Sequence, residues 1–293
     1  MKKVTLIGAG SDLGVDIDGA KLGPEKIIPN LVDKNYKTIL FHQNNNIIKS
    51  HDKSDLRKNE TEINKFNKQI YNSIIKENNF CITIGGDHSI SIASGLASIK
   101  KYSNLGLIWI DAHLDYNTFK TTITGNIHGL PLATLNGLNS DLSHFHKGNF
   151  FNPNNTVVVG YRAYEENAMD EINNIKTMGV TVYTTKDIKE YGINKIMEQA
   201  FKIANNKTDG VHISFDLDVI DPELAKGVTI KEKNGINLQE VEEITDYLAK
   251  QNNIKSFDLV EYNPLNDTDL KTLDIANNIL NKIEKSTTLQ STR

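Results

Sequence analysis

The amino-acid sequence predicts an α/β fold, in which a mainly parallel sheet is covered by helices on both faces. Short apolar runs of strand length alternate along the chain with longer segments that have the apolar period of a helix. Strands that alternate with helices in this way form parallel sheets, which are buried on both faces. The composition, 38% hydrophobic and 24% charged residues, is that of an ordinary globular protein.

The first hundred or so residues predict three strands and three helices. Strands are expected at residues 4–7, 36–41 and 80–84, and helices at residues 21–32, 59–76 and 91–100. In the second of these helices Ile63, Phe66 and Ile70 recur on one side, as in an amphipathic helix. Glycines follow the first strand at a spacing one residue off the dinucleotide-binding fingerprint, and no acidic residue follows at the required distance. This segment is therefore expected to be a loop.

The rest of the chain continues the alternation. Strands are expected at residues 105–110, 156–159, 180–183, 211–215 and 254–260, and helices at residues 168–177, 193–204, 238–250 and 270–282. Since neither a composition shift nor an internal repeat interrupts the pattern, residues 1–285 are expected to form a single domain. Residues 286–293 are polar and are expected to be a disordered tail.

Charge and composition weigh against several classes of protein. The formal net charge of −4 argues against a nucleic-acid partner, because such proteins carry a basic face. No apolar run approaches the roughly 20 residues that a membrane span needs. The single cysteine, Cys81, excludes intrachain disulfides and thiolate zinc clusters. A cytoplasmic enzyme or binding protein, with neither nucleic acid nor membrane as a partner, is therefore expected.

Ionisable side chains gather where three of the predicted strands end. The strand in "LGLIWIDAHLDYN" runs into Asp111, His113 and Asp115 at alternate positions. Two more strands end in the same kind of residue: "HISFDLDVIDP" supplies Asp216 and Asp218, and "CITIGGDHS" supplies Asp87 and His88. Alternate side chains of a strand share a face, and parallel strands bring their carboxyl ends to one edge of the sheet. We therefore expect these acids and imidazoles to lie together.

A cluster of this kind predicts a metal site. Carboxylates held close together repel one another and are costly to bury, and a bound cation removes that cost. One such motif alone is more often a solvated turn or a core histidine, but three at equivalent strand exits favour ligands. An oxygen-rich set with some imidazole suits Mn²⁺, with Fe²⁺, Co²⁺ or Ni²⁺ as alternatives. Two such ions can generate a nucleophile at neutral pH.

The motifs "GGDHS", "DAHLDYNT", "TGNIHGLPLA" and "SFDLDVIDP", in this order and spacing, resemble the ureohydrolases and, among them, arginase. The segments "GVDIDGAKLGPEKI" and "FDLVEYNP" resemble the same family, so the resemblance covers nearly the whole chain. It implies a three-layer α/β/α fold and a homotrimer or homohexamer. It also implies two Mn²⁺ ions per chain and a bridging hydroxide that attacks a guanidinium carbon, giving urea and an amine.

The resemblance assigns a role to individual residues. It implies that one metal takes His88, Asp111, Asp115 and Asp216, and that the other takes Asp111, His113, Asp216 and Asp218. Asp115 would also hold the hydroxide and help to move its proton. His128 would be the acid or base that serves the leaving amine. Glu261 would bind the substrate guanidinium through a charge-assisted pair.

The resemblance also indicates which ureohydrolase the chain is most like. The neutral donors Asn117, Thr122, Thr124 and Asn126 match the arginase loop that binds an α-carboxylate, a pattern that agmatinases do not carry. The position that reads the α-amino group falls on Glu165, and a second acidic position falls on Ala168. The donor loop favours hydrolysis of L-arginine to L-ornithine and urea, although Asn, Thr and Gly are also ordinary turn residues. Glu165 and Ala168, by contrast, depart from the family pattern.

These residues and a further departure from the family pattern leave alternatives open. Where arginases usually carry a segment like "GTPVxGG", this chain has "VTIKEKNG", with Ile230 at the threonine that supports the guanidinium-binding glutamate. Glu232 and its two lysine neighbours add charge there. The substrate could instead be another guanidino or formimino compound, or the chain could be a weakly active metal-binding relative. For Tyr161 and Arg162, a structural role and a substrate role are equally open.

Overall fold

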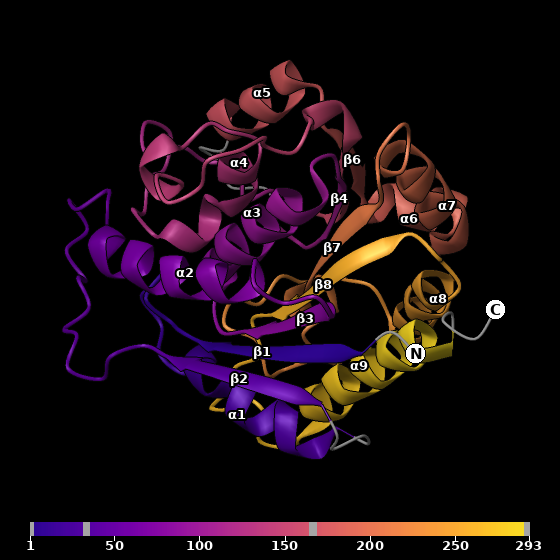
Figure 1. The fold of residues 1–293 in the computed structure, drawn as a ribbon, viewed down its shortest axis with the longest axis horizontal. Helices are drawn as coiled ribbons and strands as arrows, with labels where there is room; N and C mark the ends of the chain where they lie inside the picture. The colour runs from indigo at the N-terminus through magenta and orange to yellow at the C-terminus, as the bar shows by residue number, and fades with distance from the viewer. Residues whose placement is uncertain (1–2, 32–35, 164–168, 290–293) are drawn as a thin grey trace.

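A computed structural model describes residues 3–31, 36–163 and 169–289 of the chain. Its centre is an eight-stranded sheet with the order β2-β1-β3-β8-β7-β4-β5-β6, and all neighbouring strands are parallel (Figure 1). The strands are β1 (Val4–Gly10), β2 (Lys37–His42), β3 (Phe80–Gly85), β4 (Gly106–Ile110), β5 (Thr156–Tyr161), β6 (Thr181–Thr184), β7 (Val211–Asp216) and β8 (Ile254–Val260).

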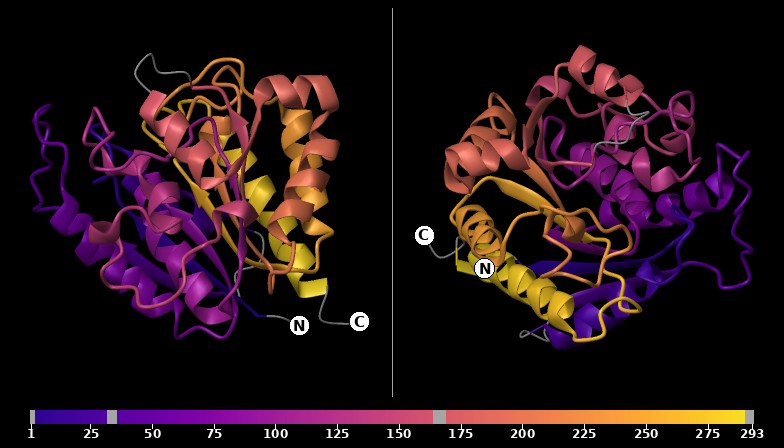
Figure 2. Two further views of the ribbon diagram at one scale, coloured as in Figure 1. Left: turned by 90° about the horizontal axis from the view of Figure 1, so that it is seen from above. Right: turned by 180° about the vertical axis from the view of Figure 1, so that it is seen from behind.

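Helices cover both faces of this sheet, so the three-layer α/β/α fold is confirmed (Figure 2). One layer consists of α2 (Glu60–Ile74), α3 (Ser91–Tyr102), α4 (Pro131–Leu135) and α5 (Met169–Met178). The other consists of α1 (Gly23–Ile27), α6 (Thr185–Tyr191), α7 (Ile193–Ala204), α8 (Leu238–Ala249) and α9 (Lys271–Leu289). Each layer packs on its own buried hydrophobic cluster.

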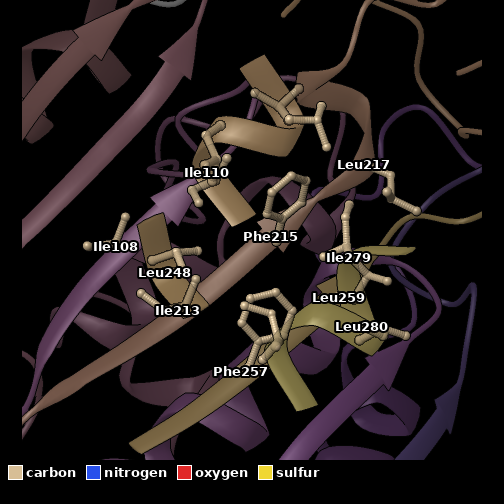
Figure 3. Close-up of a cluster of buried hydrophobic side chains, with 14 of the residues drawn as sticks. Ile108, Ile110, Ile213, Phe215, Leu217, Leu248, Phe257, Leu259, Ile279 and Leu280 are labelled. Carbon is tan, nitrogen blue, oxygen red and sulfur yellow. The ribbon is translucent and has the colours of Figure 1, made fainter. Parts of the chain in front are cut away.

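The strands alternate between these two clusters because successive side chains point to opposite faces. In β4, Ile108 and Ile110 belong to the cluster under α7, α8 and α9, whereas Leu107 and Trp109 belong to the other. Figure 3 shows the first cluster, where Phe215 of β7 and Phe257 of β8 lie among aliphatic side chains of the same strands, of β4, and of α8 and α9. This packing fixes the register of the strands that carry the site.

The predicted helix at residues 21–32 is wrong in its extent. The structure has a 3-10 turn at Ala20–Leu22, the short α1, and a second 3-10 turn at Ile28–Asn30. Pro29 lies at the start of that second turn. It has no N–H to continue an α-helix, and its ring clashes with the carbonyl one turn earlier.

Other predicted boundaries differ as well. The structure adds α4 and α6, which the sequence did not predict. Helix α9 continues to Leu289, into residues that were expected to be disordered, because helix order propagates from a segment that still packs at Ile283. The division into a domain of residues 1–285 and a short tail stays a prediction. Within the described residues, no helix combines the length and the apolar character needed to cross a membrane.

The topology places four strand exits side by side. Strands β3, β8, β7 and β4 are consecutive in the sheet and parallel, so their carboxyl ends meet at one edge. His88 follows β3, Glu261 follows β8, and Asp218 and Asp111 follow β7 and β4. Residues far apart in the sequence are thereby brought to one place.

Candidate active site

Three predicted metal ligands surround one nitrogen of His88. Its Nδ1 atom lies 3.1 Å from Asp111 Oδ2, 3.2 Å from Asp115 Oδ2 and 3.0 Å from Asp216 Oδ2. All four residues are buried. The structure thus brings together the four residues expected to hold one cation.

The other nitrogen of His88 is fixed by a hydrogen bond. Nε2 lies 2.9 Å from Ser214 Oγ of β7, and the imidazole stacks on Trp109 with 4.0 Å between ring centroids. Nδ1 has no hydrogen-bond partner among the described residues, although three carboxylates face it. A proton on Nε2 leaves the Nδ1 lone pair pointing at negative charge, an arrangement that fits a cation between them.

A second group lies on the other side of Asp111. His113 Nδ1 is 3.0 Å from Asp218 Oδ2 and 3.4 Å from Asp111 Oδ1. The ligand atoms of Asp111, His113 and Asp218 lie within 4.8 Å of one another, as do those of His88, Asp111 and Asp216. Asp111 therefore belongs to both groups, as a bridging ligand would. The predicted bridging role of Asp216 stays a prediction.

Turns, rather than strands, orient the paired ligands. β4 ends at Ile110, so Asp111 and His113 lie beyond the strand, and strand alternation is the wrong reason for their shared direction. Asp111 Oδ1 instead accepts the His113 N–H at 2.7 Å, and Asp216 Oδ1 accepts the Asp218 N–H at 2.7 Å. A carboxylate that bonds the backbone two residues on makes a tight turn, which brings both side chains to one side.

The charge of this cluster also fits divalent cations. Burial, together with the neighbouring charges of Asp218 and Asp111, raises the pKa of Asp216 well above its usual value. The ionised form of this carboxylate is therefore unfavourable here without a compensating positive charge. Four acids and two imidazoles form a donor set suited to a pair of divalent first-row ions.

Glu261 and His128, two of the predicted catalytic residues, lie against this cluster. Glu261 Oε1 accepts the His88 N–H at 2.8 Å and is 3.4 Å from His128 Nδ1. Burial raises the pKa of Glu261, but the hydrogen bond and charge of His128 outweigh it and hold the pKa below its usual value. Oε2 has no hydrogen-bond partner among the described residues. This ionised carboxylate has an atom left to bind a cation.

Two residues of the site have a backbone conformation that is costly for residues other than glycine. Asp115 has a φ of 49° and Glu261 a φ of 66°. Non-glycine residues in this left-handed region tend to occur where the surrounding structure holds them for function. In this conformation the Asp115 carboxylate faces His88 and the Glu261 carboxylate faces His128.

A small cavity opens onto the cluster. Its volume is about 180 Å³, below the roughly 300–1,000 Å³ of sites for drug-sized ligands, so it fits a small metabolite. All four predicted carboxylate-binding residues line it: Asn117, Thr122, Thr124 and Asn126. Ile230, Glu232, His128 and Glu261 line it as well. The predicted amino-group reader Glu165 lies outside the described residues, as does Ala168.

The structure adds an acidic residue that the sequence did not identify. Glu171 lines the cavity, and its Oε1 accepts the Tyr116 N–H at 2.8 Å. It lies in the first turn of α5, where a carboxylate is favoured by the helix dipole. An acidic residue at the start of a predicted helix beside the site motifs is the sequence signal that could have identified it.

Arg162 has a structural role. Its guanidinium donates to the carbonyl oxygens of Asp218 at 2.7 Å, Val219 at 2.9 Å, Glu232 at 2.9 Å and Lys233 at 3.0 Å. These bonds tie the exit of β7 to the segment at residues 230–233, which borders the cavity. Among the described residues, the hydrogen bonds of Arg162 all go to main-chain oxygens, which favours the structural alternative over a substrate role.

Comparison with known proteins agrees with this geometry. A model of the arginase family matches residues 2–284. The arginase of Bacillus subtilis is 34% identical over 287 residues, covering 92% of this chain and 94% of that protein. The solved structure of Entamoeba histolytica arginase in complex with L-ornithine superposes with a TM-score of 0.88 at 27% identity, covering 97% of this chain and 98% of that one. Formimidoylglutamase of Bacillus subtilis shares the fold, with a TM-score of 0.80 at 22% identity, covering 99% of this chain and 88% of that one.

Family match, fold and site geometry lead to the same conclusion. The family model spans nearly all of the chain, and the residues that resemble its metal motifs meet at one edge of the sheet. The chain therefore belongs to the arginase family and is a hydrolase of guanidino carbon–nitrogen bonds.

Proposed function

We propose that this enzyme hydrolyses L-arginine to L-ornithine and urea with two Mn²⁺ ions bound per chain. The observation that carries the proposal is the polarity of the cavity. One lining residue, Glu261, is a buried carboxylate with an oxygen that has no hydrogen-bond partner among the described residues, whereas Asn117 and Thr122 line the cavity as neutral donors. A guanidinium group suits the first and an α-carboxylate suits the second. The 34% identity with an arginase supports the same substrate.

The residues that would hold the ions are those that the family resemblance assigns. His88, Asp111, Asp115 and Asp216 would bind one ion, and Asp111, His113, Asp216 and Asp218 the other. Bound there, the pair would lower the pKa of water so that hydroxide is available at neutral pH. The oxygen-rich donor set with two imidazoles favours Mn²⁺ over Zn²⁺, with Fe²⁺, Co²⁺ and Ni²⁺ as alternatives.

The remaining residues would bind the substrate and move protons. Glu261 Oε2 would pair with the guanidinium and aim its carbon at the cluster. Asp115 would accept the proton that the attacking water loses. His128, which lies beside Glu261, would donate a proton to the amine nitrogen as the carbon–nitrogen bond breaks. Glu171, together with Glu165, would pair with the α-ammonium group.

A second candidate substrate is another guanidino or formimino compound. Ile230 and Glu232 line the cavity where the family pattern has different residues, and Ile230 cannot donate a hydrogen bond to Glu261. These changes would alter the shape and charge that a substrate meets. A weakly active metal-binding relative is a third candidate, and the intact pair of His128 and Glu261 counts against it.

The biological setting is also proposed. A homotrimer or homohexamer, a cytoplasmic location, and the lack of nucleic-acid or membrane partners all stay predictions. Size-exclusion chromatography with light scattering would test the assembly.

Urea release from L-arginine tests the proposal directly. The purified chain is preincubated with Mn²⁺ and compared with an Asp115→Asn variant. Urea that depends on the metal and is lost in the variant would support L-arginine as the substrate. Protein that binds two ions per chain but releases no urea would favour the second candidate, and a panel of guanidino and formimino acids would then identify the substrate.

A further inference from the structure

The two histidines of the cluster are arranged in the same way. Each turns Nδ1 toward carboxylates, so each carries its proton on Nε2 when Nδ1 binds a cation. For His88, the outer nitrogen meets the buried hydroxyl of Ser214. For His113, the outer nitrogen faces a carboxylate instead, with Nε2 3.8 Å from Glu232 Oε1.

The main chain of Glu232 is held firmly near His113. Arg162 donates to the carbonyl oxygen of Glu232 at 2.9 Å and to that of Asp218 at 2.7 Å. The same guanidinium thus anchors the acid and a neighbouring metal ligand. The Glu232 side chain is 36% exposed, and a small rotation would shorten the 3.8 Å contact to the roughly 2.9 Å of a hydrogen bond.

The charge of Glu232 is directed at His113. Lys231 and Lys233 flank it in the sequence, yet the ion pair that the described residues give Glu232 is with His113.

We propose that Glu232 is a positioning residue for the metal ligand His113, accepting the Nε2 proton and thereby strengthening the cation bound on that side. A carboxylate behind a ligating imidazole fixes its tautomer and raises its basicity. That side needs the support more, because the His113 side chain is 24% exposed whereas that of His88 is 1% exposed. The inference rests on the two-cation centre of the proposed function.

Binding of Mn²⁺ alone, followed by the electron paramagnetic resonance signal of the free ion, tests this inference without any substrate. The wild type is expected to bind two ions per chain. Glu232→Ala should weaken one of the two sites by about 10- to 100-fold, the usual effect of losing such a partner, and leave the other unchanged. Glu232→Gln keeps a neutral acceptor oxygen and should fall between the two. Lys231→Ala, a matched change in the same segment, should bind as the wild type does.

The outcomes separate this inference from the function on which it rests. Two ions bound with equal affinity by the wild type and by Glu232→Ala would overturn the role of Glu232 alone. An equal loss at both sites, with a melting temperature in EDTA that also falls, would overturn it too, because that is the result of general damage. A wild type that binds fewer than two ions would overturn the binuclear centre and with it this inference.

Discussion

At the scale of single residues, the segments around the site are held together by side chains that donate hydrogen bonds to main-chain oxygens. Arg162 is the clearest case, since one guanidinium joins the carbonyl oxygens of Asp218 and Val219 to those of Glu232 and Lys233. A lysine cannot replace it, because an ammonium lacks the planar fork that reaches several acceptors at once. The sequence indicated that Arg162 lies at a strand exit, but only the folded structure shows which oxygens it binds.

Replacing Arg162 by methionine should therefore destabilise the fold. Several carbonyl oxygens would lose a charged donor, which should lower the free energy of unfolding by about 3–5 kcal/mol. Arg57→Met is the matched control, since Arg57 is 45% exposed and pairs with surface acids, and it should cost less than about 1 kcal/mol. Urea denaturation in EDTA measures both. Equal losses in the two variants would contradict the structural role.

At the scale of elements, the loop that carries the predicted carboxylate donors is positioned by the segment before α2. Gly125 has a φ of +70°, and a Cβ there would come within 2.1 Å of the Asp55 carbonyl oxygen, so the two segments touch. Lys58 is buried beside this contact, with Nζ 2.8 Å from Asp16 Oδ2 and 3.4 Å from Asn126 Oδ1. The ammonium group thus connects the N-terminal loop with the rim of the cavity.

Lys58→Met should loosen this loop without touching the reacting atoms. The KM for L-arginine is expected to rise by roughly tenfold, equivalent to about 1.4 kcal/mol, while kcat changes little. Lys65→Met on α2 is the control, because Lys65 is 64% exposed and pairs with Glu62 at the surface. Steady-state kinetics with Mn²⁺ separate the two constants. A fall in kcat at constant KM would show that Lys58 serves the chemistry instead.

Long helices with a clear apolar period were predictable from the sequence, and short helices were not. The helices at residues 59–76 and 193–204 were predicted nearly to the residue, because their apolar side chains recur over three or more turns. Helix α4 is only 5 residues long, too short for a period to show. Helix α6 could have been found from its capping box, in which Thr184 and Asp187 bond each other's backbone.

At the scale of the whole molecule, the sequence predicted which residues meet but not how they are held. Parallel strands must end at one edge, so the chain order alone places His88, Asp111 and Asp216 together. The support around them comes from tertiary contacts that no local pattern encodes. Ser214 behind His88 and Glu171 at the cavity wall are examples, since each depends on a neighbouring element.

The carboxylates at this edge of the sheet serve the proposed metal site but reduce the stability of the fold when no cation is bound. Four buried carboxylates repel one another, so the fold without cations carries a cost that bound cations remove. Mn²⁺ at a hundred times its Kd should therefore raise the free energy of unfolding by about 2.7 kcal/mol per site. The melting temperature should rise with it. EDTA should reverse the gain. A melting temperature that does not respond to the ion would contradict the binding site.

Asp216→Asn should separate the cost of the clustered carboxylates from the stabilisation by bound cations, because it removes a charge while keeping the hydrogen bonds. The introduced amide oxygen can still accept the Asp218 N–H, and its NH₂ can donate to His88 Nδ1, which lies 3.0 Å from Asp216 Oδ2 and has no partner among the described residues. In EDTA this variant should melt about 2–4 °C above the wild type, the shift that about 1 kcal/mol produces in a large domain. In Mn²⁺ it should gain far less than the wild type, so the order of the two proteins reverses. Asp246→Asn, a surface acid on α8, should leave both values unchanged. A variant that melts below the wild type in EDTA would mean that Asp216 stabilises the fold by itself, and that the cluster does not depend on a cation to balance its charge.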